Sequence, residues 1–216
     1  MIRIVIADDH ELFREGLRQL LTRGGEFEVV GEAGSAPETM QCVRKLAFDV
    51  LILDLAMPGR SGVDLVRQVK SERPDLPILV LSMHAEDQYA LRALAAGASA
   101  YLTKGSRADV VHQALRRLAG GGRYIGEHVA ALMATESQPP PEEPGLRALS
   151  DREFQVMQAL VSGESVSEIA RRLHLSVKTI STHKSNVLRK LGCTSLAALV
   201  QYAIEHGLTS DSPRPS

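Results

Sequence analysis

Two adjacent acids, Asp8 and Asp9, directly follow the apolar run IRIVIA at residues 2–7. Neighbouring carboxylates repel each other, and their joint ionisation is unfavourable. A third acid, Asp54, lies near the end of another apolar run, VLILDL at residues 50–55. If the fold brings the three carboxylates together they need a cation, and Mg²⁺ prefers oxygen ligands. The acids therefore predict a magnesium site at the ends of these runs.

Two more polar residues lie at the ends of apolar runs further along the chain. Ser82 is the last residue of ILVLS, and Lys104 directly follows ASAYLT. An acid cluster with Mg²⁺, a lysine and a hydroxyl contains the groups needed for phosphoryl transfer, which depends on positioning and electrostatic stabilisation. A carboxylate can itself be the nucleophile and form an acyl phosphate. Asp54 is the candidate nucleophile, because it stands alone before the turn sequence AMPGRSG. His10 and His84 flank this site, and we expect solvated neighbours rather than ligands, since Mg²⁺ prefers oxygen to imidazole.

The fold of the first half is predicted from its pattern of apolar runs. Five short runs alternate with segments that carry apolar residues at three- and four-residue steps, which is typical of strands alternating with helices. The runs lie at residues 2–7, 27–33, 50–55, 78–82 and 98–103. The third and fourth are continuously apolar, which indicates strands covered on both faces. We therefore expect a five-stranded, doubly wound parallel α/β sheet whose ligands bind beyond the carboxyl ends of the strands.

The second half carries helix signals and no strand signal. Ser150 and Ser165 each precede a Glu by three residues, which matches the capping box. Ser176 and Thr194 are good N-caps for two further helices, and Gly192 is placed to end one of them in a left-handed conformation. The predicted helices span residues 150–161, 165–173, 176–191 and 194–206, with a tight two-residue turn between the second and the third.

The third predicted helix has a polar face that suits a DNA groove. Its apolar residues face a core, while hydroxyls and bases lie on the other side at helical spacing, as in helices that enter the major groove. The candidate DNA contacts are Lys178, Thr179, Ser181, Thr182, His183, Ser185 and Arg189. An ordinary amphipathic helix with a solvated face fits these residues equally well, since residues 147–206 carry only eight basic residues against five acidic ones.

Residues 1–120 resemble the receiver domain of bacterial two-component response regulators. The matching residues are Asp8 and Asp9, Asp54 before Met57-Pro58-Gly59, Ser82, Tyr101 and Lys104, with Gly105 where many receivers have a proline. The resemblance implies that a sensor histidine kinase phosphorylates Asp54. It also implies that Mg²⁺ is bound by Asp9, Asp54 and the backbone carbonyl of Ala56, with Asp8 acting from beside them. Ser82 and Lys104 would hold the phosphoryl group, and Tyr101 would be a switch that turns inward.

Residues 149–200 resemble the LuxR-type DNA-binding domain. The match includes Ile169-Ala170, Leu173, Ser176, Lys178-Thr179-Ile180, His183, Asn186, Val187 and Lys190-Leu191-Gly192. A receiver joined to such a domain is the architecture of the NarL/FixJ family. This resemblance implies a transcription regulator that binds double-stranded DNA and forms a homodimer when active, with RNA polymerase as a further candidate partner. We expect phosphorylation to shift an equilibrium between an inactive and an active state.

The predicted domains are a receiver at residues 1–122, a linker at 123–146, a helix-turn-helix domain at 147–208 and a flexible tail at 209–216. The linker is predicted from the stretch TESQPPPEEPG, which has three adjacent prolines and no apolar period.

The composition of the chain also limits its function. The chain is 44% hydrophobic and 24% charged, which is typical of a soluble globular protein. It has no apolar run of about 20 residues and no signal peptide, so we expect a cytoplasmic protein without membrane contact.

The rival function is an aspartyl-phosphate phosphotransferase or phosphatase acting on a small molecule. Against it, no second acid follows Asp54 by two residues, and the chain has no Gly-rich phosphate loop. We therefore expect no enzyme beyond self-catalysed phosphoryl transfer and autodephosphorylation. A helical domain that binds protein rather than DNA is a third alternative.

Overall fold

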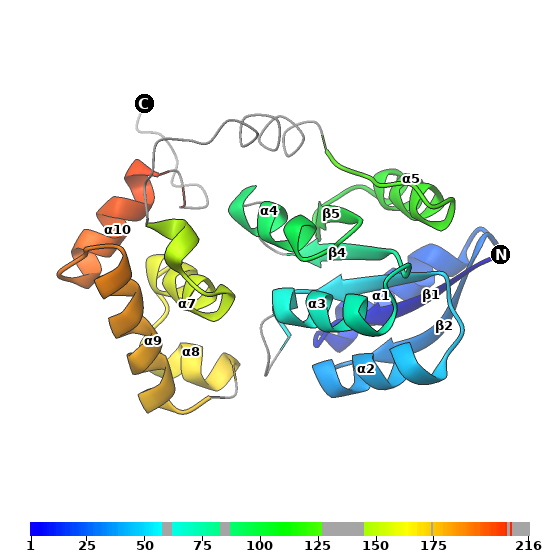
Figure 1. Ribbon diagram of the computed structural model, residues 1–216. Helices are drawn as coiled ribbons and strands as arrows, with labels where there is room; N and C mark the ends of the chain where they lie inside the picture. Colours follow the sequence, from blue (N-terminus) through cyan, green and yellow to red (C-terminus); the bar gives the residue numbers. More distant parts are fainter. Residues whose placement is uncertain (58–61, 83–86, 127–144, 174, 207, 209–216) are drawn as a thin grey trace. The chain divides into compact units, whose positions relative to one another are not determined.

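The chain divides into two compact units, residues 1–135 and 136–216, in the computed structural model (Figure 1). The structure describes residues 1–57, 62–82, 87–126, 145–173, 175–206 and 208. Most of the predicted linker and the whole predicted tail lie outside these residues, so the three boundaries between the predicted segments stay predictions. In the described part of the chain, the first unit alternates strands with helices and the second consists of helices.

The first unit is a parallel sheet of five strands in the order β2-β1-β3-β4-β5. The strands are β1 (Ile2–Ala7), β2 (Phe27–Ala33), β3 (Val50–Asp54), β4 (Ile78–Ser82) and β5 (Ala100–Thr103). The helices that alternate with them are α1 (Glu11–Thr22), α2 (Ala36–Lys45), α3 (Gly62–Glu72), α4 (Asp87–Ala95) and α5 (Ala108–Ala119). This topology confirms the predicted doubly wound parallel fold, although β5 begins two residues later than predicted.

Helices cover both faces of the sheet. Ile4 and Ile6 of β1 pack with Leu21 of α1 and Leu115 of α5 in one buried cluster, so α1 and α5 cover one face. The helices α2, α3 and α4 follow one another in contact along the other face (Figure 1). All five residues of β3 and all five of β4 are buried, which confirms that these strands are covered on both sides.

Gly62, the first residue of α3, lies against the backbone of Leu55 beside the end of β3. A Cβ at residue 62 would come within 2.3 Å of the Leu55 Cα and 2.4 Å of its carbonyl oxygen. We expect Gly62→Ala to destabilise the first unit by about 1–3 kcal/mol or more, because backbone atoms cannot move aside without displacing Asp54. The matched control is Gly16→Ala in α1, where a Cβ meets no atom within 4 Å.

Gly16→Ala should stabilise the unit by roughly 0.5–1 kcal/mol, because alanine is a better helix former than glycine. Urea unfolding of the full chain measures both variants. Similar effects of the two substitutions would contradict the close approach of Gly62 to Leu55.

In its described residues, the second unit contains a short 3₁₀ helix at Leu146–Ala148 followed by four α-helices. These are α7 (Asp151–Val161), α8 (Val166–Arg172), α9 (Val177–Lys190) and α10 (Leu196–Glu205). The capping boxes at Ser150 and Ser165 are both present, Ser176 caps α9, and Gly192 has a φ of +68°, so these predictions are confirmed.

The predicted N-cap at Thr194 is wrong. Ser195 caps α10, because its Oγ accepts a hydrogen bond of 3.1 Å from the backbone N–H of Ala198. Both hydroxyl residues suit an N-cap by type. The start of α10 is therefore decided by packing that places Leu199 and Ala203 in the core, which the residue types alone do not reveal.

Glu153 joins the start of α7 to the end of α9. Its Oε2 accepts hydrogen bonds from the Ser150 backbone N–H at 2.8 Å and from the Lys190 Nζ at 2.6 Å. Its side chain is 6% exposed. Burial acts to raise the pKa of Glu153, but the bonds from Lys190 and Ser150 outweigh burial and leave the pKa below its usual value.

We expect the second unit to lose stability as the pH falls below about 4.5, the usual pKa of a glutamate. A carboxyl whose pKa is lowered by folding stabilises the protein above its unfolded pKa, and this contribution disappears as the pH falls through the folded pKa. Glu153→Gln should make the stability of the second unit less dependent on pH in this acidic range. At pH 7 it should lower the free energy of unfolding by about 1–3 kcal/mol. Thermal unfolding between pH 7 and 3 measures both, with the exposed Glu205→Gln as the control. If Glu153→Gln loses as much stability at low pH as the unaltered protein does, groups other than Glu153 cause that loss.

Candidate functional site

The carboxyl ends of β1, β3 and β5 bring together residues that are far apart in the sequence. Asp8 follows β1 and Asp54 ends β3, and because Ala7 pairs with Leu53 in parallel register the two acids lie side by side. Lys104 follows β5, and its Nζ lies 2.6 Å from the Asp8 Oδ2 and 2.9 Å from the Asp54 Oδ2. All three side chains are buried. The strand ends therefore form a compact acid–lysine cluster.

Burial and pairing set the charges in this cluster. Burial raises the pKa of Asp54, Lys104 opposes that rise and Asp8 adds to it, so the Asp54 pKa lies above its usual value. Burial acts to lower the pKa of Lys104, but Asp54 and Asp8 together raise it above its usual value. The Lys104 Nζ also lies 4.6 Å from the ring centroid of Phe13, which attracts the charge further. Lys104 is thus held as a cation between two carboxylates.

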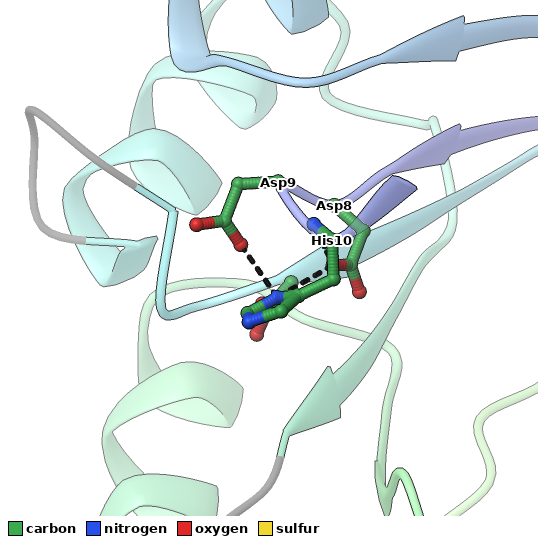
Figure 2. A group of neighbouring side chains, drawn as sticks. Asp8, Asp9 and His10 are labelled. Carbon is green, nitrogen blue, oxygen red and sulfur yellow. Dashed lines mark hydrogen bonds and ion pairs between the residues drawn. The ribbon is translucent and has the colours of Figure 1, made fainter. Parts of the chain in front are cut away.

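Asp9 and His10 complete the cluster on its more exposed side (Figure 2). The Asp9 Oδ1 is buried and accepts no hydrogen bond, although it lies 2.9 Å from the His10 Nδ1. The same Nδ1 lies 3.2 Å from the Asp8 Oδ1. One ligand atom from each of Asp8, Asp9, His10 and Asp54 lies within 4.8 Å of all the others. The structure therefore offers a compact set of donors for a metal ion, and this set includes a histidine.

Ser82 and Tyr101 lie on the neighbouring strands β4 and β5. Ser82 ends β4 and is buried, and its backbone carbonyl accepts a hydrogen bond from Lys104 N–H at 2.8 Å. Tyr101 belongs to β5 and is 8% exposed. The backbone N–H of Ala56 donates to the Asp54 Oδ1 at 3.0 Å. Of the residues quoted for the receiver resemblance and its surroundings, Pro58, Gly59 and His84 lie outside the described residues.

The second unit presents the predicted DNA-contact residues on α9. Four residues separate α8 from α9, and the predicted tight turn includes His174, which lies outside the described residues. The apolar side chains of Ile169, Ile180 and Val187 on these helices are buried. Five of the seven candidate contacts are exposed, and Thr179 and His183 are half-buried. The exposed ones are Lys178, Ser181, Thr182, Ser185 and Arg189.

Hydroxyl groups on this face are already bound to the helix backbone. Thr182 donates to the carbonyl of Lys178, and Ser185 donates to the carbonyl of Ser181, both at 3.0 Å. Each hydroxyl keeps acceptor capacity toward solvent or a ligand. Val177, the first residue of α9, is 51% exposed and was not among the predicted contacts. Its exposure places an apolar group at the N-terminal end of the same helix.

His183 differs from the other candidate contacts. Its Nδ1 is buried and has no hydrogen-bond partner. Burial and the nearby Arg152 lower the pKa of His183, while Glu153 acts against them. His183 therefore lies at the margin of the core, and burial favours its neutral form.

Fold and site together define a class of protein. An α/β unit with a buried acid–lysine cluster at its strand ends, joined to a helix-turn-helix unit, is the architecture of a DNA-binding response regulator. The described helices include none that is long and apolar enough to cross a membrane.

Comparison with known proteins identifies the family. The response regulator receiver domain matches residues 4–116, and the domain of the bacterial regulatory proteins of the luxR family matches residues 147–203. The chain therefore belongs to the NarL/FixJ family of response regulators, as the resemblance predicted, and is a DNA-binding transcription regulator by family rather than a classical enzyme.

Relatives and solved structures agree with this family along nearly the whole chain. Response regulator UvrY of Escherichia coli (strain K12) is 35% identical over 96% of both chains. Response regulator GacA of Pseudomonas aeruginosa is 33% identical over 96% of this chain and 98% of its own. The RcsB response regulator of Salmonella typhimurium has a TM-score of 0.70 at 30% identity, over 97% of this chain and 98% of its own.

Proposed function

We propose that a sensor histidine kinase phosphorylates this chain on Asp54 and that phosphorylation controls its binding to double-stranded DNA. The observation that carries the proposal is the Lys104 ammonium held between the buried carboxylates of Asp8 and Asp54. Such a cation is placed to stabilise negative charge that develops beside Asp54. A carboxylate nucleophile next to a fixed positive charge suits transfer of a phosphoryl group.

The cluster fits a divalent cation such as Mg²⁺. The buried Asp9 Oδ1 accepts no hydrogen bond, so its lone pairs are available to a cation, whereas both Asp8 oxygens already contact the Lys104 Nζ or the His10 N–H. Asp9, Asp54 and the backbone carbonyl of Ala56 would hold the ion, with Asp8 as the supporting acid. When bound, Mg²⁺ would neutralise charge on the phosphoryl oxygens.

Each residue of the cluster would have a separate role in phosphoryl transfer. An oxygen of Asp54 attacks the phosphorus of the kinase phosphohistidine, the N–P bond breaks, and the imidazole nitrogen keeps the electron pair. Lys104 and the hydroxyl of Ser82 then bind oxygens of the new acyl phosphate. Tyr101, already buried on the adjacent strand, would respond to the new position of Ser82. Water can later hydrolyse the anhydride, which gives autodephosphorylation without a further protein group.

The second unit would bind DNA. RcsB has been solved in a complex with DNA and as two dimers bound to two parallel DNAs. We extend both properties to this chain: α9 would lie in the major groove of double-stranded DNA, and the active form would be a homodimer. RNA polymerase is the partner that a transcription regulator would affect, and the cytoplasm is where it would meet both DNA and a kinase.

We expect Lys178→Ala to weaken DNA binding and to reduce its salt dependence. Lys178 is exposed on α9, and each phosphate contact adds about 0.9 to the slope of log K against log salt concentration. The matched control is Lys45→Ala, an exposed lysine at the end of α2 in the first unit. Fluorescence anisotropy with labelled DNA at several salt concentrations measures the slopes. Equal losses in the two variants would indicate attraction by net charge instead of a contact from α9.

The proposed function is tested by selecting DNA with the purified full chain. Sheared genomic DNA is incubated with the protein before and after treatment with acetyl phosphate and Mg²⁺, and the bound fragments are sequenced. We expect phosphorylation to enrich a small set of sites at a salt concentration that removes non-specific binding. Identical fragments in both samples would contradict control by phosphorylation, and turnover of a generic phosphate ester would favour an enzyme instead.

A further inference from the structure

Arg14 ties helix α1 to the backbone between the two adjacent acids of the cluster. Its Nη1 donates a hydrogen bond of 2.6 Å to the backbone carbonyl of Asp8. Its Nε lies 3.4 Å from the Oε2 of Glu32 on β2, and only 17% of the Arg14 side chain is exposed. A guanidinium presents its N–H groups in a rigid planar fork, so the two contacts hold it in one orientation. Arg14 therefore connects α1, the end of β1 and β2.

The backbone of Asp8 is held on both sides as a result. The Asp8 N–H donates to the Ala33 carbonyl of β2 at 3.0 Å, and the Asp8 carbonyl accepts the bond from Arg14. This carbonyl belongs to the planar peptide unit that joins Asp8 to Asp9. Figure 2 shows the carboxylates of Asp8 and Asp9 projecting from the two ends of this unit. A change in the orientation of the unit would redirect the side chain of Asp9, so the bond from Arg14 helps to fix that direction.

The side chain of Asp9 depends on its backbone for its direction. Its Oδ1 is buried and accepts no hydrogen bond. The same oxygen lies 2.9 Å from the Nδ1 of His10, a residue whose own side chain is 61% exposed. The carboxylate that would bind the cation is thus available to an ion, but an exposed imidazole is a weak support for its position. The tie between Arg14 and the preceding peptide unit is a firmer one.

We propose that Arg14 is a positioning residue of the cation site, and that its bond to the Asp8 carbonyl directs the Asp9 carboxylate toward the ion. This inference rests on the proposed function, since it concerns the same cation. Groups that orient metal ligands commonly contribute about 10–100-fold to metal affinity. The charge of Arg14 acts in the opposite sense, because a nearby positive charge repels Mg²⁺. A loss of affinity on removing Arg14 would therefore report the lost hydrogen bond and not the lost charge.

The test compares Arg14→Met with Arg18→Met in the full chain. Arg18 lies one turn further along α1, and its Nε approaches the other oxygen of Glu32, also at 3.4 Å. It donates a hydrogen bond to Glu15, whereas Arg14 donates to Asp8. Both variants lose one positive charge and one contact with Glu32, and methionine suits a helix about as well as arginine. The pair of variants therefore differs in the bond to the Asp8 carbonyl.

Calorimetry with Mg²⁺ alone gives the Kd of each variant. We expect the Kd to rise about tenfold or more in Arg14→Met. In Arg18→Met it should stay the same or fall, because only charge and a surface contact are lost. A Kd that is unchanged or lower in Arg14→Met, or that rises equally in both variants, would overturn the proposal.

The dependence of phosphorylation on Mg²⁺ provides a second readout. The full chain is treated with acetyl phosphate at increasing Mg²⁺ concentrations. We expect the concentration for half-maximal labelling to rise in Arg14→Met by the same factor as the Kd, while the maximal rate remains similar, because excess Mg²⁺ restores the bound position of Asp9. A lower maximal rate with an unchanged Mg²⁺ requirement would mean that Arg14 only supports the fold, which contradicts the positioning role.

A measurement on the unaltered protein keeps the proposal testable if Arg14→Met does not fold. Nuclear magnetic resonance of the arginine side chains reports how fast the Nη–H protons exchange with water. We expect slower exchange for Arg14 than for Arg18, because Arg14 is more buried and its Nη1 is bound to a backbone carbonyl. Equally fast exchange in both would show that the bond to Asp8 is absent, and the proposal would be wrong.

The proposed function fails in a different way. If the unaltered protein is phosphorylated with Mg²⁺ but Arg14→Met keeps the same Kd, the role of Arg14 is wrong and the phosphoacceptor site stands. If the unaltered protein binds Mg²⁺ but takes up no phosphoryl group, the proposed function is wrong, and the Kd values still decide the role of Arg14. If it does not bind Mg²⁺, both are wrong.

Discussion

Asp54→Asn is expected to take up no phosphoryl group from acetyl phosphate and to be more stable than the unaltered protein when metal is removed. The amide has nearly the shape of the carboxylate and can still accept a bond from Lys104, but it lacks the anionic oxygen that attacks phosphorus. Incorporation should therefore fall to background rather than decrease gradually. Mass spectrometry of the intact chain after treatment with acetyl phosphate and Mg²⁺ measures the result.

The gain in stability follows from the environment of Asp54. Burial and the charge of Asp8 keep its pKa above the usual value despite Lys104. A carboxyl whose pKa is raised by folding contributes its full stability below the unfolded pKa, near 3.8, and loses that contribution as the pH rises through the folded pKa. At pH 7 the ionised Asp54 thus lowers the stability of the first unit. We expect Asp54→Asn to restore on the order of 1 kcal/mol at pH 7 and little near pH 3.8.

Asp64→Asn is the matched control for both effects. Asp64 belongs to α3 in the same unit, but its side chain is 52% exposed and pairs with Arg67 on the surface. This variant should be phosphorylated normally, and its stability should change by about 0.5 kcal/mol or less. Phosphorylation of Asp54→Asn to the level of Asp64→Asn would place the phosphoacceptor elsewhere.

Much of the first unit could be predicted because its sequence signals are local and repeated. Continuously apolar runs marked β3 and β4 as buried strands, and parallel strands place their carboxyl ends at one edge. That edge is enough to predict that Asp8, Asp54 and Lys104 approach one another, as the structure shows. In the second unit, Ser and Glu three residues apart predicted two helix starts correctly, since a capping box needs only neighbouring residues.

The remaining features depend on geometry that residue types do not specify. His10 was expected to be a solvated neighbour of the site, and 61% of its side chain is exposed, but the backbone bond to Asp8 and the contact of its ring with both carboxylates could not be predicted from residue type. Phe13 beneath Lys104 was missed for the same reason, since a contact between a helix and a strand end depends on the packing of α1 on the sheet. The choice of Ser195 over Thr194 as N-cap likewise depends on the core of the second unit.

Lys104→Ala is expected to destabilise the first unit by about 3–5 kcal/mol at pH 7, because it leaves two buried carboxylates without their cation. Asp8 and Asp54 would then face each other with only repulsion between them. The loss should decrease as the pH falls and Asp54, whose pKa is raised by burial, takes up a proton. It should also decrease when Mg²⁺ replaces the missing charge. Hydrogen exchange measured on peptides of the first unit reports this stability separately from that of the second unit.

A double-mutant cycle separates the lost charge pair from a simple loss of packing. If Lys104 acts mainly on the carboxylates, Asp54→Asn combined with Lys104→Ala should be more stable than Lys104→Ala alone, because only Asp8 remains uncompensated. The control is Lys70→Ala in α3, where the half-buried lysine donates to the backbone carbonyl of Pro74 at 2.9 Å. That variant should lose only about 1 kcal/mol, since a neutral acceptor can be solvated when the lysine is removed. A loss in Lys104→Ala no larger than in Lys70→Ala, with no recovery in the double variant, would show that the acid cluster does not depend on Lys104.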